Sequence, residues 1–137
     1  MHTCNLQGCK VGRVFLTLAA LFGCLAVMLG AFGAHALSSK LSEPMLGVFK
    51  TAVDYQFWHV AALLAVGLLV QHWPNIRLLK CAGMFFVIGM LLFSGSLYLM
   101  TLAGIKLGVV TPIGGVCLML GWLSLALSVW CLPRAGA

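Results

Sequence analysis

The sequence predicts an all-α integral membrane protein built from four transmembrane helices. Of its 137 residues, 63% are hydrophobic and only 7% are charged, so the chain lacks the polar surface that a soluble domain of this size presents to water. Four apolar stretches, at residues 14–36, 52–70, 82–103 and 108–132, each approach the ~20 residues that cross a ~30 Å hydrocarbon core as a helix. Because they lack strict alternation, they are predicted to be helices rather than barrel strands.

The first stretch has two interpretations. Two basic residues precede it, and segment 34–36 resembles the small-residue cleavage site of a secretory signal peptide. Its apolar run is longer than the ~7 to 15 residues typical of such a peptide. We therefore expect an uncleaved helix, preceded by a cytoplasmic N-terminal arm at residues 1–13.

Small residues mark the end of the first helix. Ala26, Gly30 and Ala34 recur every four residues and form a smooth stripe that another helix can approach closely. We assign Gly33 to the same packing surface. His35 lies away from the stripe, where it either binds headgroups or water, or belongs to a functional site.

The longest connection covers residues 37–51. Its apolar residues 45–49, beside Lys50, fit either a short interfacial helix or an irregular loop. Since all the connections are short, we expect one domain without a soluble module.

The second helix opens with polar and aromatic side chains. Helical spacing places Tyr55 over His59 and Asp54 over Trp58, with Gln56 beside them. The aromatic residues alone would form an interfacial belt. An ionisable residue costs about 2.5 to 3.5 kcal/mol at the centre of a membrane helix, so these groups need partners. A structural polar network and a site that binds or moves something both remain open.

The third and fourth helices carry further candidates. In the third, Ser94 and Tyr98 share a face and Gly95 allows close approach, while the environment of an activated serine nucleophile is missing. In the fourth, Thr111 is a natural N-cap before a proline of the first turn. The glycines predicted to permit a tight crossing of the fourth helix are Gly114, Gly115 and Gly121.

Alternating helix direction brings the polar residues of all four helices into one half of the bundle. This arrangement favours a site, and it is equally compatible with a polar network that fixes one fold. The candidate polar cluster comprises His35, Asp54, Tyr55, Gln56, His59, Ser94, Ser96, Tyr98 and Thr111.

Basic residues indicate the orientation. Five of the eight Lys and Arg residues lie in the two termini and the second loop, and three lie in the first and third loops. The positive-inside rule then places both termini in the cytoplasm. Their scattered positions fit membrane topology and argue against nucleic-acid binding.

The cysteines suggest no metal or cofactor. Four of the six lie in or at the edges of apolar stretches, where thiols behave as small hydrophobic groups. Cys4 and Cys9, with His2, lack the fourth ligand of a structural zinc site.

Four segments together resemble the domain of unknown function 423 family. They are residues 30–35 (GAFGAH), 55–59 (YQFWH), 93–98 (FSGSLY) and 111–115 (TPIGG). The resemblance covers the chain from about Arg13 onward and implies a small bacterial inner-membrane protein with four helices, similar also to the transmembrane protein 256-like proteins of eukaryotes. It implies no particular activity.

Two functions remain open. The first is a non-enzymatic accessory protein that packs against lipids, a second copy or another membrane protein and helps to maintain envelope integrity. The second is an oligomeric channel or carrier for a proton, ion or small solute, with His35, Asp54 and His59 as its titrating groups. A membrane enzyme is disfavoured, because the chain has only two acidic residues.

Overall fold

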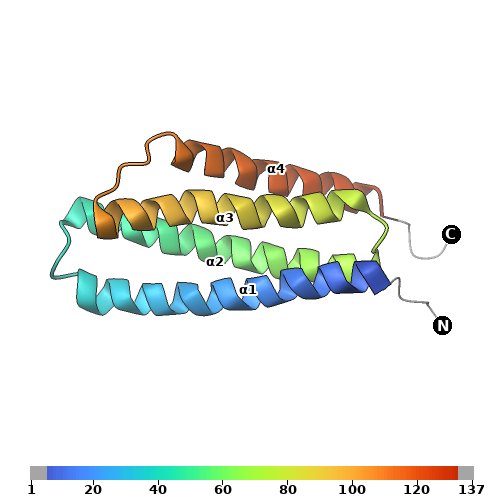
Figure 1. Cartoon of the computed structure of the whole chain (residues 1–137), viewed down its shortest axis with the longest axis horizontal. Helices are drawn as coiled ribbons and strands as arrows, with labels where there is room; N and C mark the ends of the chain where they lie inside the picture. The colour runs from blue at the N-terminus through green and yellow to red at the C-terminus, as the bar shows by residue number, and fades with distance from the viewer. Residues whose placement is uncertain (1–5, 133–137) are drawn as a thin grey trace.

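The computed structural model describes residues 6–132, which form four long helices (Figure 1). Helix α1 (Leu6–Phe32) continues into a π-helix, η1 (Gly33–Leu37), and is followed by α2 (Glu43–His72), α3 (Arg77–Ala103) and α4 (Val110–Trp130). All four helices are long and apolar enough to cross a membrane, which confirms the predicted fold class.

Some sequence predictions lie outside this description. His2 and Cys4 precede the described residues, and the side chain of Cys9 is not described either. The expectation that these three residues form no metal site therefore concerns side chains outside the described part of the chain.

Several helix boundaries differ from the predicted stretches, and three of them change an earlier assignment. Helix α1 begins at Leu6, inside the segment assigned to the N-terminal arm. Helix α2 begins at Glu43, so residues 45–49 are its first turns, neither a separate interfacial helix nor a loop. Helix α4 begins at Val110, which moves Thr111 inside the helix and corrects its assignment as an N-cap.

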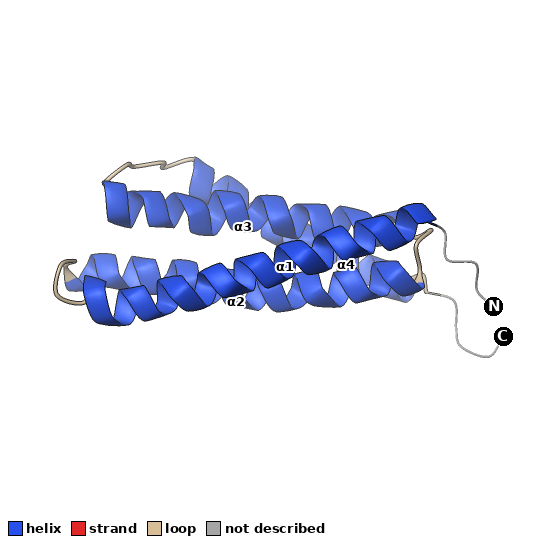
Figure 2. Cartoon of the chain, turned by 60° about the horizontal axis from the view of Figure 1, so that its bottom comes forward, coloured by secondary structure: helices blue, strands red, loops and turns tan. Residues whose placement is uncertain are grey.

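The helices form an antiparallel bundle in which each packs mainly on its neighbours in the chain (Figures 1 and 2). Both ends of the described chain lie at one end of the bundle (Figure 1). The α1–α2 and α3–α4 connections lie at the opposite end, which we call the connection end. Half of the most apolar part of α2 is buried, against 17% for α1 and 22% for α4. The outer helices therefore direct most of their apolar surface away from the bundle.

The core is built from side chains that fit against glycines of the next helix. A Cβ atom at Gly83 of α3 would overlap the ring of Phe15, the point at which the oblique α1 reaches α3 (Figure 2). On the α3–α4 interface, Gly89 gives room to the side chain of Leu118, and Gly121 to the ring of Phe86. Such knob-and-glycine contacts let membrane helices approach closely without a hydrophobic driving force between them.

The residues predicted to permit close helix packing differ in what surrounds them. Gly114 lies directly against the backbone of Phe93, and Gly33 lies against the ring of Phe49. The close approach predicted at Gly95 is wrong for this chain. A Cβ atom there would meet no atom of another helix within 4 Å, because α4 crosses α3 on another face. The remaining predicted positions are Ala26, which is fully buried, Gly30 and Gly115, where a Cβ atom would make ordinary contacts, and Ala34, which is exposed.

Candidate functional site

Gln56 of α2 connects three helices through its amide. Its side chain is 3% exposed, and its Nε2 donates a hydrogen bond to the carbonyl oxygen of Phe22 in α1 at 2.8 Å. Its Oε1 accepts a hydrogen bond from the hydroxyl of Tyr98 in α3 at 2.9 Å. Both ends of the amide are therefore satisfied inside the protein, as a buried polar group requires.

His59 lies one turn further along α2 and connects it to α4. Its Nε2 is 3.1 Å from Nε1 of Trp122, and its Nδ1 is 2.6 Å from the carbonyl oxygen of Tyr55. An indole N–H only donates, so Nε2 of His59 accepts and Nδ1 carries the ring proton. The two hydrogen bonds thus fit a neutral imidazole and satisfy both of its nitrogens.

A third set of hydrogen bonds holds the start of α4 against α3. The hydroxyl of Ser96 donates to the carbonyl oxygen of Phe93 at 2.8 Å and lies 2.6 Å from the hydroxyl of Thr111. Since Ser96 has only one proton and the carbonyl can only accept, Thr111 is the donor in the second bond. Thr111 therefore joins two helices, in place of the capping role predicted for it.

Aromatic rings surround these hydrogen bonds. The rings of Tyr55 and Phe93 stack with centroids 4.5 Å apart, and the rings of Phe49 and Tyr98 lie 5.3 Å apart. An edge-on contact at 5.3 Å joins Phe86 to the Trp122 ring. These rings and the hydrogen-bonded groups lie together across α2, α3 and α4.

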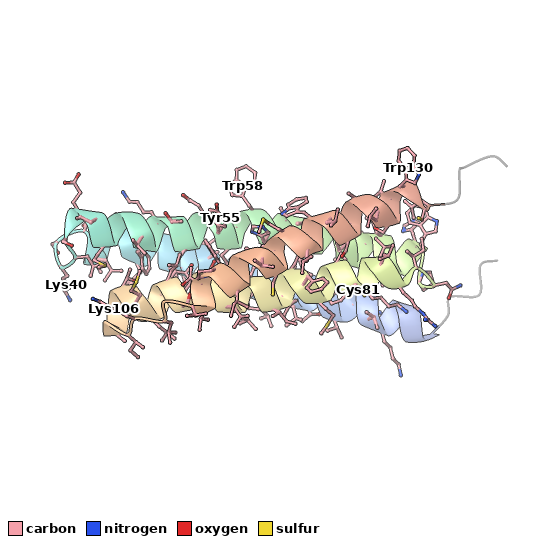
Figure 3. All side chains as sticks on the ribbon, turned by 90° about the horizontal axis from the view of Figure 1, so that it is seen from above. Lys40, Tyr55, Trp58, Cys81, Lys106 and Trp130 are labelled. Atoms are coloured by element: carbon pink, nitrogen blue, oxygen red, sulfur yellow. The ribbon has the colours of Figure 1, made fainter. Side chains whose placement is uncertain are left out.

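The candidate polar cluster does not converge on one point. His35 and Asp54 are exposed, whereas His59 is 7% exposed and turned toward α4. Trp58 points away from the bundle, 73% exposed (Figure 3). The structure therefore separates the three groups expected to titrate together, because residues 54 and 59 lie on different faces of α2.

Ser94 is the remaining member of the candidate polar cluster. It is buried in α3, and its hydroxyl has no hydrogen-bond partner among the described residues. Within the same part of the chain, no three His, Cys, Asp or Glu side chains are grouped to hold a metal ion.

Two cavities lie near the connection end of the bundle. The larger, about 460 Å³, is a groove along α3 beside the loop that leads to α4. The smaller, about 190 Å³, lies between η1 and α2, and both Lys50 and Asp54 contribute to its wall. Neither is lined by His35 or His59, so neither of these two cavities assembles the expected titrating set.

Sequence reasoning missed Trp122, the partner of His59. It is a tryptophan in the middle of a mainly apolar helix, and an indole N–H at that depth needs an acceptor. That requirement was a usable signal. Phe22 carried no such signal, because only its backbone carbonyl takes part.

Comparison with known proteins decides the family. The profile described as "Protein of unknown function (DUF423)" matches residues 29–115, which include the candidate polar cluster and the lining of both cavities. The chain belongs to the DUF423 family. Its sequence is 41% identical over 119 residues to a UPF0382 membrane protein of Staphylococcus aureus, covering 86% of this chain and 96% of that protein.

Two further relatives come from other bacteria. The UPF0382 membrane protein YwdK of Bacillus subtilis is 38% identical over 85% of this chain and 95% of its own length. The UPF0382 inner membrane protein YgdD of Escherichia coli is 37% identical over 90% of this chain and 95% of its own length. No solved structure matches the chain. The family and the four apolar helices together make this chain a multi-pass membrane protein.

Proposed function

We propose that this DUF423 protein is a non-enzymatic accessory protein of the bacterial plasma membrane, which contributes to envelope integrity through contacts with lipids and membrane proteins. The observation that carries the proposal is the hydrogen bonding of the buried polar residues. Gln56, His59 and Ser96 each have their polar atoms bonded to other helices or to nearby carbonyl groups. Groups that are used to hold helices together are not free to bind a solute.

The outer helices support the same proposal. Helices α1 and α4 leave most of their apolar surface outside the bundle, where it contacts lipid, a second copy or another membrane protein. Exposed side chains include Leu21 and Met28 on α1 and Met119 and Leu123 on α4. Such surfaces suit a protein that works by contact.

The alternative function is an oligomeric channel or carrier. It would require His35, Asp54 and His59, or their copies in neighbouring subunits, to line one water-filled path. Within one chain they lie apart, and the His59 ring nitrogens are already bonded. A catalytic role has less support still, since Glu43 and Asp54 are the only acidic residues and both are exposed on α2.

The proposal can be tested in Escherichia coli lacking YgdD. We expect the mutant strain to take up more of a hydrophobic dye than its parent, and we expect expression of this chain to restore the barrier. His35→Ala and Asp54→Asn should restore it as well as the wild type, because neither exposed group has a role in the proposal. Unchanged dye uptake on deletion, or a complete requirement for Asp54, would contradict the accessory function.

A further inference from the structure

The larger cavity is a groove between the half of α3 nearer the connection end and the residues that lead into α4. Its volume is about 460 Å³. Aliphatic side chains dominate its walls: Leu91, Leu92, Leu99 and Leu102 from α3, Leu107 from the loop, and Val110 from the start of α4. Leu91, Gly95, Leu99 and Leu102 recur at intervals of four, four and three and so share one face of α3.

The polar side chains that line the groove have no free proton to donate to a polar solute. Ser96 and Tyr98 are the members of its lining that carry side-chain hydroxyls. The first donates to the Phe93 carbonyl, and the second donates to Gln56. At Gly95 the helix leaves open space, with no atom within 4 Å of a Cβ position. These features suit a hydrocarbon chain.

The length of the groove matches one leaflet of a bilayer. Leu91 and Leu102 both line it, and at ~1.5 Å per residue they lie roughly 16 Å apart along α3. Half of a ~30 Å hydrocarbon core is about 15 Å. An acyl chain of the leaflet at the connection end can therefore lie along the whole groove.

The charged residue next to the loop end of the groove is basic. Lys106 is exposed and adjoins Leu107 of the lining, at the same end of the molecule as Lys40 (Figure 3). The two acidic residues of the chain, Glu43 and Asp54, are both on α2, so α3, α4 and the loop between them carry none. A phosphate group is the complementary headgroup charge at this position.

We propose that this groove binds one phospholipid with an anionic headgroup, its acyl chain along α3 and its phosphate at Lys106. The inference rests on the proposed function, because it identifies lipid as one of the contacts through which the protein acts. The competing occupant is a helix of a second copy, which would also fill the space at Gly95.

Native mass spectrometry of the full chain, purified in detergent from membranes containing phosphatidylglycerol and phosphatidylethanolamine, tests the proposal. We expect the wild type to retain phosphatidylglycerol and Gly95→Leu to lose it, because the new side chain fills the groove. Gly47→Leu is the matched control, since Gly47 is another helical glycine with open space around it, outside the groove. Retention of lipid by Gly95→Leu, or equal loss in both variants, would overturn the proposal.

The headgroup contact has its own comparison. Lys106→Gln should weaken phosphatidylglycerol binding about fivefold, the effect of removing one lysine near an anionic phosphate, while Lys40→Gln should leave it unchanged. Equal binding by wild type and Lys106→Gln would remove the assigned headgroup position.

A photo-crosslinking residue at Leu99 tests the occupant without relying on a filled groove. Leu99 is 46% exposed, so a larger side chain there leaves the core intact. We expect crosslinks to phospholipid in intact membranes, whereas crosslinks to a second copy would overturn the lipid assignment. The dye-uptake assay has a separate readout, so loss of the lipid site and loss of the accessory function can be told apart.

Discussion

Gln56 shows how one amide can hold three helices. An amide offers both a donor and an acceptor, and here each faces a different neighbour: the Phe22 carbonyl in α1 and the Tyr98 hydroxyl in α3. A carboxylate could not donate to the carbonyl, and an aliphatic side chain could do neither. The position therefore specifies glutamine by chemistry as well as by size.

We expect Tyr98→Phe to destabilise the protein by about 0.6 kcal/mol, the average for hydrogen bonds between membrane helices, and by no more than about 1.7 kcal/mol, the largest value. Gln56→Leu should cost more, because it removes both bonds and leaves the Tyr98 hydroxyl without its acceptor. Unfolding in mixed detergents would measure both single variants and the double variant.

The double variant should be less destabilised than the sum of the single changes, since the two residues share a bond. Tyr55→Phe is the control, because the Tyr55 hydroxyl makes no hydrogen bond with the described residues, and we expect little change in its free energy of unfolding. Additive effects of Gln56→Leu and Tyr98→Phe would rule out the bond between them.

His59 makes a spectroscopic prediction. We expect ¹⁵N solid-state NMR in lipid bilayers to show the neutral tautomer with its proton on Nδ1, because the Trp122 indole can only donate to Nε2. Trp122→Phe should shift the Nε2 resonance and leave Nδ1 bonded to the Tyr55 carbonyl. A proton found on Nε2 in the wild type would contradict the assigned network.

At the residue scale, the sequence identified groups that needed partners but not the partners themselves. The cost of polar groups in a bilayer singled out Gln56 and His59. The partner of His59 lies 63 residues away, on a face of α4 that only helix packing selects. His35 and Asp54 were grouped with them by depth alone, and depth does not determine which face a side chain takes.

At the scale of helices, glycine position separates contact from open surface. A Cβ atom at Gly114 would overlap backbone atoms of Phe93, which cannot move unless α3 and α4 separate. Gly95 has the same residue type and a helical backbone but no neighbour within 4 Å. Small-residue spacing predicted both as packing positions, and sequence alone cannot distinguish them.

We expect Gly114→Ala to destabilise the protein by about 1 to 3 kcal/mol, as overpacking of a close contact does. Gly95→Ala should be neutral or stabilising by up to about 1 kcal/mol, since alanine is the better helix former. The same detergent unfolding experiment measures both. Equal effects at the two positions would show that α3 and α4 do not cross at Gly114.

Helices α1, α2 and α3 begin before their apolar stretches for a physical reason. Helix α2 has 30 residues, or about 45 Å at ~1.5 Å per residue, which matches a bilayer with its headgroup layers included. Hydropathy detects only the part of a helix that lies in hydrocarbon. Chain direction and helix number could therefore be predicted, while the polar end turns could not.

At the scale of the whole molecule, both ends of the described chain lie at the same end of the bundle (Figure 1). The distribution of basic residues predicts that this side is cytoplasmic. A C-terminal fusion to green fluorescent protein should fluoresce in an Escherichia coli host, and the same fusion to alkaline phosphatase should be inactive. The opposite pair of results would invert the orientation and place the lipid groove in the cytoplasmic leaflet.

The packing of the helices also explains why the polar residues of the core do not by themselves indicate a function. Hydrogen bonds of Gln56, His59 and Ser96 fix α1 on α2, α2 on α4 and α3 on α4, while the outer surfaces of α1 and α4 remain apolar. In this account the buried residues stabilise the fold, and the outer surfaces make the contacts through which the protein acts.

Proton flux into liposomes that contain the purified protein tests this account most directly. With an imposed pH gradient and membrane potential, we predict the same flux for wild type, His59→Ala, Asp54→Asn and protein-free liposomes, each variant first shown to be folded. Flux above that of protein-free liposomes, abolished by Asp54→Asn or His59→Ala, would contradict the account and identify the protein as a conductor.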